Sequence, residues 1–166
     1  MNAWSEVPRI PASAGALIWD PAGRLLILKP TYKKGWTIPG GQVNADGESP
    51  WAACRRETRE ECGLVVDHGR LACVDYLRPK PSRPGGVRFL FDCGTLPEAA
   101  FHGVVLQETE IEDHLRAELG EALKLLSGPL RRRVSQCAGR PEFVYLEDGR
   151  PVPGVTTEVR EDLQAG

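Results

Sequence analysis

The order of strand-like and helix-like segments is the feature that most constrains how this chain can fold. Two apolar runs, at residues 14–20 and 24–29, flank a Pro-Ala-Gly turn signal and therefore predict a hairpin of buried strands. A helical segment follows at 50–62, and two more strand patterns come after it, at 64–77 and 86–94. This order favours an α/β or α+β architecture in which a mixed β-sheet is sandwiched between α-helices.

The rest of the chain supplies shorter elements. We predict strands at 36–38 and 101–106, helices at 114–126 and 129–138, and an Asp-Gly hairpin within 142–152. The segment RPKPSRPGG, residues 78–86, is too rich in proline and glycine for regular structure, and we expect a mobile basic loop there. Because no linker or repeat divides the chain, residues 1–155 are expected to form one domain and residues 156–166 a frayed tail.

Composition excludes several classes of protein. With 166 residues, 41% of them hydrophobic, and a formal net charge of -2, the chain fits one soluble globular domain without a basic field for nucleic acid or membranes. No apolar run approaches the roughly 20 residues needed to cross a bilayer, and the N-terminus lacks the order of a secretory signal, so the cytoplasm is the expected compartment. Five scattered cysteines suggest neither a disulfide framework nor a zinc site.

The helix predicted at 50–62 has well-marked ends. Ser49 is a good N-cap, Pro50 suits the first helical position, and Gly63 suits a left-handed residue just past the C-terminus. Within this helix, Glu57, Glu60 and Glu61 stand at positions i, i+3 and i+4, which places their carboxylates in one sector of the helix surface.

These three carboxylates repel one another, at a cost of roughly 0.2 to 0.5 kcal/mol per pair, and they lie near the negative end of the helix dipole. A divalent cation would turn this conflict into a binding site, because clustered carboxylate oxygens are what magnesium prefers. The alternative is an ordinary solvated helix face on which the neighbouring arginines screen the acids. Spacing alone leaves both interpretations open.

The wider context resembles the Nudix box of the Nudix hydrolases. That pattern is Gly, five residues, Glu, seven residues, then Arg-Glu-U-x-Glu-Glu-x-Gly-U, where U is a bulky apolar residue. From Glu48 onward the spacing matches, with the polar Thr58 at the first apolar position and Leu64 at the second. Six residues rather than five separate Gly41 from Glu48, so the box at residues 41–64 carries a one-residue insertion, which turn-tolerant residues within 42–47 could absorb.

The resemblance implies a Nudix fold and a hydrolase that cleaves a diphosphate linkage, commonly in a nucleoside diphosphate derivative, by water attack at phosphorus. Magnesium, with manganese as the alternative, would be the cofactor, held by Glu57, Glu60 and Glu61. Arg56 would orient a neighbouring glutamate through a bidentate contact, and the amides of Gly40 and Gly41 could approach a phosphate. A surface ion pair for Arg56 and a plain turn for the glycines are the alternatives.

Outside the box the candidates are less specific. Glu110, our choice among the acids at 108, 110 and 112, follows a predicted strand where many Nudix enzymes place a further metal ligand or base, although a solvated loop acid is the alternative.

Lys29, Arg78 and Lys80 are expected to receive substrate phosphates, with ordinary surface cations as the alternative. Lys33 and Lys34, before the box, and Arg83 and Arg88, beside the loop at 78–86, belong to the same basic candidates. Tyr32, Trp36 and Tyr76 are candidates for stacking on a base.

The expected partner is therefore a small-molecule diphosphate, with no membrane, no sequence-specific nucleic acid and a homodimer left open. The competing hypothesis is a catalytically inactive Nudix-fold module that binds a nucleotide or a protein. Retention of all three helix acids argues against it. A third hypothesis, an interaction domain with a charged helix, predicts no metal binding.

Overall fold

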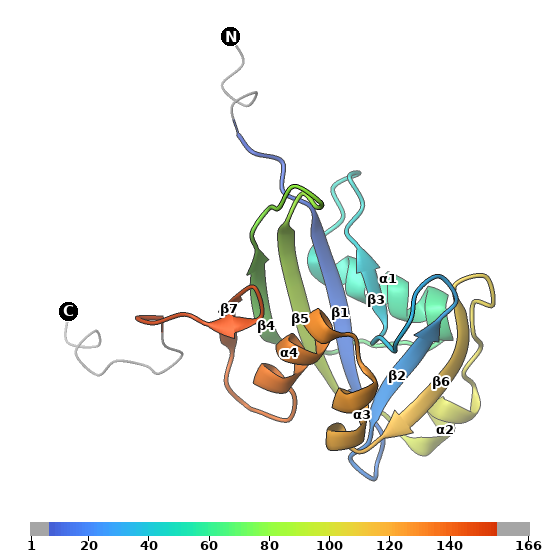
Figure 1. Ribbon diagram of the computed structural model, residues 1–166. Coiled ribbons are helices and arrows are strands. Elements are labelled where there is room, and N and C mark those ends of the chain that lie inside the picture. The colour runs from blue at the N-terminus through green and yellow to red at the C-terminus, as the bar shows by residue number, and fades with distance from the viewer. Residues whose placement is uncertain (1–6, 156–166) are drawn as a thin grey trace, which may run out of the picture.

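The fold is one mixed, eight-stranded β-sheet with helices on both faces (Figure 1). The computed structural model describes residues 7–155, so the predicted tail at 156–166 lies outside the described residues. The strand order is β6-β2-β1-β5-β4-β7-β8, with β3 paired to β1. The predicted architecture, a mixed sheet between helices, is confirmed. No helix among residues 7–155 is long and apolar enough to cross a membrane.

The predicted N-terminal hairpin consists of β1 (Ala12–Trp19) and β2 (Leu25–Pro30). Its turn is held by the buried Asp20, whose carboxylate accepts hydrogen bonds from the backbone amides of Ala22 and Arg24 at 3.0 and 2.9 Å. The two strands pair where Trp19 faces Leu25. Toward its other end, β1 pairs instead with the short strand β3 (Gly40–Gln42).

The second half of the sheet mixes parallel and antiparallel pairs. Strand β5 (Gly86–Thr95) lies parallel to β1 and antiparallel to β4 (Arg70–Leu77). Strand β7 (Val144–Glu147) is parallel to β4 and forms the predicted Asp-Gly hairpin with β8 (Arg150–Pro151). Asp148 in its turn has φ 51, which an Asp at this position tolerates.

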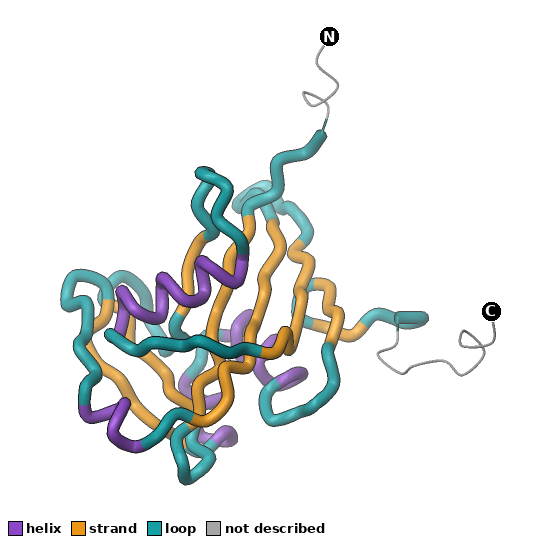
Figure 2. The backbone as a smooth tube through the Cα atoms, turned by 180° about the vertical axis from the view of Figure 1, so that it is seen from behind, coloured by secondary structure: helices purple, strands orange, loops and turns teal. Residues whose placement is uncertain are grey.

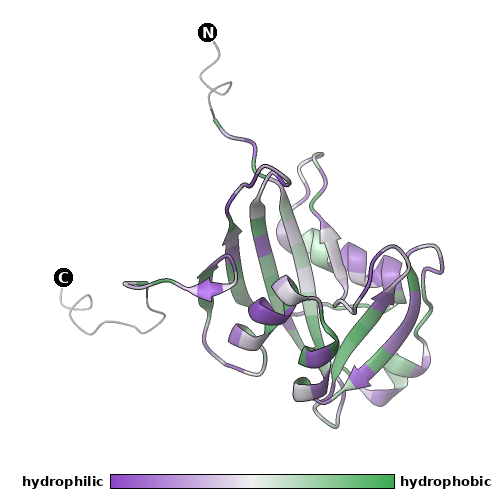
Figure 3. Ribbon diagram, in the orientation of Figure 1, coloured by the Kyte–Doolittle hydropathy of each residue, from purple (hydrophilic) through white to green (hydrophobic). Residues whose placement is uncertain are grey.

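Two apolar layers cover the sheet, one on each face. The front layer lies under α3 (Leu119–Leu125) and α4 (Gly128–Cys137), and the back layer lies under α1 (Pro50–Cys62) and α2 (Glu98–His102), as Figures 1 and 2 show from opposite sides. Residues of β2 alternate between the layers, with Leu25 and Ile27 in the front one and Leu26 and Leu28 in the back one. Burial on both faces explains the continuous apolar run of β2, which Figure 3 shows as mostly hydrophobic.

Four sequence-based assignments differ from the structure. Residues 101–106, predicted as a strand, contain the end of α2 followed by irregular chain. Residues 114–117, predicted to start a helix, belong to β6 (Ile111–Ala117), where pairing with β2 overrides their helical pattern. The predicted strand at 64–77 begins only at Arg70, and residues 36 and 37 form isolated bridges while the true strand is β3.

Candidate active site

Helix α1 has the predicted bounds, Pro50–Cys62, and the predicted caps. The Ser49 hydroxyl accepts a hydrogen bond from the amide of Ala52 at 3.1 Å, and Pro50 occupies the first turn. Gly63 adopts a left-handed conformation with φ 72 and donates its amide to the Arg59 carbonyl at 2.9 Å. These caps fix where the helix starts and ends, and with it the direction in which its acids project.

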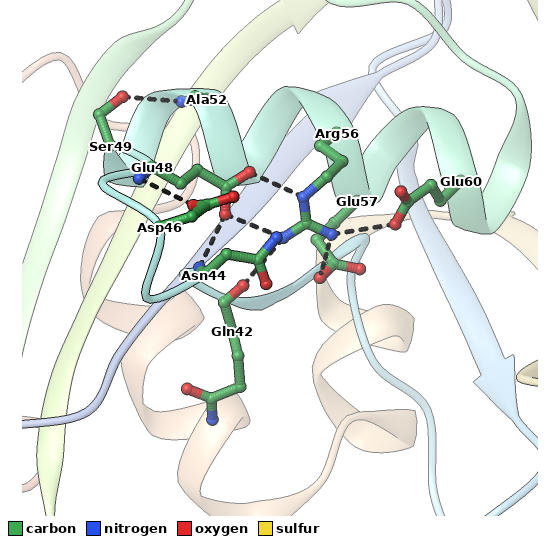
Figure 4. Close-up of polar contacts among 9 residues, drawn as sticks. All are labelled: Gln42, Asn44, Asp46, Glu48, Ser49, Ala52, Arg56, Glu57 and Glu60. Carbon is green, nitrogen blue, oxygen red and sulfur yellow. Dashed lines mark hydrogen bonds and ion pairs between the residues drawn. The ribbon is translucent and has the colours of Figure 1, made fainter.

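Arg56 is the centre of a polar network on this helix (Figure 4). Its guanidinium makes a bidentate contact with Glu48, at 2.7 Å from Nε to Oε1 and 3.0 Å from Nη2 to Oε2. Nη1 also donates to Glu57 at 2.8 Å and to Glu60 at 2.9 Å, and Nη2 donates to the Gln42 carbonyl at 3.0 Å. Arg56 therefore holds three carboxylates and one backbone carbonyl, the orienting contact expected from the resemblance.

The insertion before Glu48 is absorbed within its own loop. The Glu48 carboxylate accepts the amide of Asn44 at 2.8 Å, and the Asp46 carboxylate accepts the amide of Glu48 at 3.2 Å. Gly47 has φ 94, a conformation that glycine adopts without strain. The enlarged turn returns Glu48 to Arg56, so the extra residue does not disturb the network.

Gly40 and Gly41 bring β3 against the acidic face of α1. The amide of Gly40 donates to Oε2 of Glu61 at 2.8 Å. A Cβ atom at Gly41 would overlap the carboxylate of Glu57, and one at Gly40, where φ is 150, would overlap the Ala14 carbonyl. Glycine at 41 thus leaves room for the Glu57 carboxylate, and glycine at 40 lets β3 pack closely against β1.

Burial makes these carboxylates resist ionisation. Glu61 is only 2% exposed, and burial raises its pKa to about 8, with the charges of Glu57 and Glu110 acting in the same direction and the Gly40 hydrogen bond opposing them. Burial also raises the pKa of Glu57, while Arg56 opposes this rise. Mutual destabilisation of clustered carboxylates is the electrostatic condition that a bound cation relieves.

The donor set fits a hard divalent cation, although within residues 7–155 no three acidic, histidine or cysteine side chains converge into a ready-made metal cage. Arg56 holds Glu57 and Glu60, and Gly40 holds Glu61, so the carboxylates are ordered by protein partners. Oxygen ligands from one or two carboxylates, completed by water and substrate phosphates, are the usual magnesium arrangement. An all-protein cage is not required for that arrangement.

A cavity of about 380 Å³ opens on the front face of the sheet beside β3. Its lining includes Gly40, Gly41 and Gln42, residues of β1 and β5, and the start of α4. Three basic side chains line it: Lys33, Arg88 and Arg133. The same glycines therefore contact the helix acids and border a cavity with positive charge.

The predicted substrate-binding residues fall into two groups. Gly40 and Gly41 border the cavity, but Lys29, Arg78 and Lys80 are absent from its lining. Arg78 instead pairs with Glu147 and with Asp148, the latter at 2.9 Å. The backbone of Lys80 pairs with that of Arg83 in an isolated bridge.

The sequence indicates some of the other cavity-lining residues and not others. Lys33 belongs to the basic group named above and lies within electrostatic range of Glu61. Arg88 belongs to the basic residues around the loop at 78–86 that the sequence indicates for substrate phosphates, and it lines the cavity. Arg133 lies on α4 and carried no sequence signal. Glu110 is exposed, and its charge reaches both Glu57 and Glu61.

The sequence and the fold are similar to those of known proteins. The family model described as NUDIX domain matches residues 9–136. The protein belongs to the Nudix family. Among solved Nudix structures, MutT protein from Methanosarcina mazei Go1 is 27% identical, with 76% of this chain and 90% of that chain covered and a TM-score of 0.62.

Two further structures show the breadth of this Nudix likeness. An Ap4A hydrolase from C. elegans is 27% identical over 76% of this chain and 96% of that chain, with a TM-score of 0.57. The Nudix domain of Shewanella oneidensis NrtR, complexed with ADP ribose, is 14% identical over 82% and 90% of the two chains, with a TM-score of 0.62, and shares the fold alone. No curated protein sequence matches.

Proposed function

We propose that this Nudix protein is a magnesium-dependent hydrolase, with manganese able to substitute, that cleaves a diphosphate linkage in a nucleoside diphosphate derivative or a related compound. The observation that carries the proposal is the position of Gly40 and Gly41, which contact Glu61 and Glu57 and also border the cavity. A diphosphate in the cavity beside these glycines would lie next to the acids of α1. The proposed functional domain is residues 1–155, and a cytoplasmic location stays a prediction from sequence.

The residues divide the work between binding and orientation. Glu57, Glu60 and Glu61 would hold the cation, which when bound neutralises phosphate charge and lowers the pKa of water. Arg56 keeps Glu57 and Glu60 in place through its 2.8 and 2.9 Å contacts. Because a fixed geometry avoids reorganisation during the reaction, this orientation contributes to the rate.

Two basic groups would serve the substrate. Lys33 lines the cavity within range of Glu61, so its ammonium can meet a phosphate oxygen near the acids. Lys29, Arg78 and Lys80 would have to reach the substrate through movement, because none lines the cavity. Glu110 is proposed as an additional acid, either a metal ligand or the general base, because its charge acts on Glu57 and Glu61.

The test is a panel of diphosphates incubated with the protein and magnesium, with release of phosphate and of nucleoside monophosphate as the readouts. The panel includes sugar nucleotides, dinucleoside polyphosphates and nucleoside triphosphates. We expect turnover of at least one compound, and we expect a chelator to abolish that turnover. Binding of a compound without turnover at any metal concentration would instead support the non-catalytic binding module.

A further inference from the structure

Arg88 is a cavity-lining cation without a carboxylate partner. It is half-buried on β5, and among residues 7–155 its side chain makes no ion pair and only a long hydrogen bond, 3.4 Å from Nη1 to the Val87 carbonyl. Burial and the nearby Arg133 guanidinium lower the pKa of Arg88, while the charge of Asp75 only partly opposes this. A desolvated guanidinium next to another one is costly unless an anion joins it.

The buried carboxylate that faces Arg88 already accepts hydrogen bonds from other groups. Asp75 is fully buried and faces Arg88 across the β4–β5 pair, but its Oδ2 accepts Nε of Arg133 at 2.8 Å. Its Oδ1 accepts the amide of Gly149 at 2.9 Å. One carboxylate with both oxygens hydrogen-bonded therefore serves Arg133, and Arg88 contributes an excess positive charge to the cavity.

Strand register separates Arg88 from the glycines beside the acidic helix. Ser13 on β1 pairs with Gln42 of β3 on one side and with Arg88 of β5 on the other. Two strand spacings, roughly 10 Å, therefore lie between the backbones of Gln42 and Arg88. The guanidinium also turns away from the glycine end, because its Nη1 lies 2.7 Å from the place where a Cβ would stand on Gly86, two residues earlier on the strand.

This separation exceeds the reach of one diphosphate group. Its two phosphorus atoms share a bridging oxygen and lie closer together than neighbouring strands, which are about 4.8 Å apart. A diphosphate seated beside Gly40 and Gly41 would leave the Arg88 guanidinium to another part of the substrate. That part must carry the negative charge that Arg88 lacks within the protein.

We propose that Arg88 binds a second anionic group of the substrate, a phosphate or a carboxylate on the moiety attached to the diphosphate. Planar bidentate recognition of such an oxyanion is what a guanidinium does best. The preferred substrates are then diphosphate compounds with an extra acid, and their counterparts without that acid bind more weakly. This inference rests on the proposed function, because it assumes that the diphosphate binds beside Gly40 and Gly41.

The experiment measures binding in chelator, where magnesium-dependent turnover is absent. The ligands are two pairs that differ in one acidic group: NADPH against NADH for a phosphate, and UDP-glucuronic acid against UDP-glucose for a carboxylate. The parent should bind the more acidic member of at least one pair about tenfold tighter or better. In Arg88→Gln this ratio should fall to near one, while affinity for the less acidic member stays within about twofold.

Arg132→Gln is the matched control, because Arg132 is an exposed arginine of α4 that is absent from the cavity lining. It should keep the parental ratio. Arg88→Lys keeps the positive charge but lacks the bidentate guanidinium, so it should retain part of the preference. This variant also tests the inference if Arg88→Gln does not fold. A parent without preference in either pair, or Arg88 variants with the parental ratio, would overturn the inference. Absence of hydrolysis with the preference intact would instead remove only the proposed function.

Discussion

The buried carboxylate of Glu61 accepts a hydrogen bond from the backbone amide of Gly40, with 2.8 Å between Oε2 and nitrogen. This bond joins the last turn of α1 to β3, the strand that borders the cavity. The acids and the cavity wall are thus fixed relative to each other. Changes on either side should alter activity more than folding.

Gly41→Ala tests that coupling. The new Cβ would overlap the carboxylate of Glu57, which ends a flexible side chain and can swing aside at little cost in stability. We expect the melting temperature to stay close to the parental value and turnover to fall about 10- to 100-fold, because a displacement of about 1 Å in a catalytic group has this scale of effect. Gly120→Ala is the control, since a Cβ there meets open space, and equal turnover in both variants would refute the coupling.

Arg56→Lys tests the orienting network. A lysine retains the charge but has no fork to hold Glu48, Glu57 and Glu60 together, so we expect turnover to fall by about tenfold or more and stability by about 1 kcal/mol. Arg55→Lys on the same helix is the control, because Arg55 pairs with the exposed Asp67 at 3.3 Å. Kinetics and denaturant unfolding of both variants give the comparison, and a fully active Arg56→Lys would contradict the assigned role.

The pH dependence of stability tests the burial of Glu61. Its pKa is raised from 4.5 to about 8, so the folded state keeps a proton that the unfolded state loses. The stability that this neutral carboxyl contributes is fully present below about pH 4.5 and is lost as the pH rises through 8. In chelator, the free energy of unfolding of the parent should therefore be lower at pH 9 than at pH 5, and Glu61→Gln should reduce that difference. Identical pH profiles of parent and variant would show that Glu61 is not buried as described.

Thr58→Val tests the polar departure from the family pattern. Thr58 is fully buried, and its hydroxyl has no hydrogen-bond partner among the described residues. Removing an unsatisfied buried hydroxyl while keeping the shape should stabilise the protein by up to about 1 kcal/mol. Thr58→Ser keeps the hydroxyl and loses a methyl group, so it should destabilise. A destabilised Thr58→Val would mean that the hydroxyl has a partner after all.

Local signals explain what the sequence predicted well. The caps of α1 act within a few residues, so Ser49, Pro50 and Gly63 were sufficient to place its ends. The spacing of Glu57, Glu60 and Glu61 is likewise a property of one helix. The apolar runs of β1 and β2 are typical of strands buried on both faces, which is what the two core layers produce.

Long-range pairing explains what the sequence did not predict. Residues 114–117 have a helical pattern and become a strand only because β2 offers an edge for pairing. The sequence indicates Arg88 as a basic candidate but not Arg133, because the cavity that they share exists only after β5 and α4 meet. Asp75, fully buried against Arg133, likewise looked like an ordinary strand residue until the fold supplied its partner.

The central claim is that the acids of α1 carry the catalysis, and the most direct test is the turnover of Glu57→Gln and Glu61→Gln on a diphosphate that the parent hydrolyses. Initial rates are measured with saturating magnesium, with the exposed Glu142→Gln as the control and thermal unfolding as the check on folding. Both variants should fold and lose about two or more orders of magnitude in turnover, roughly 3 kcal/mol, while the control keeps the parental rate. Near-parental turnover in both folded variants would contradict the account.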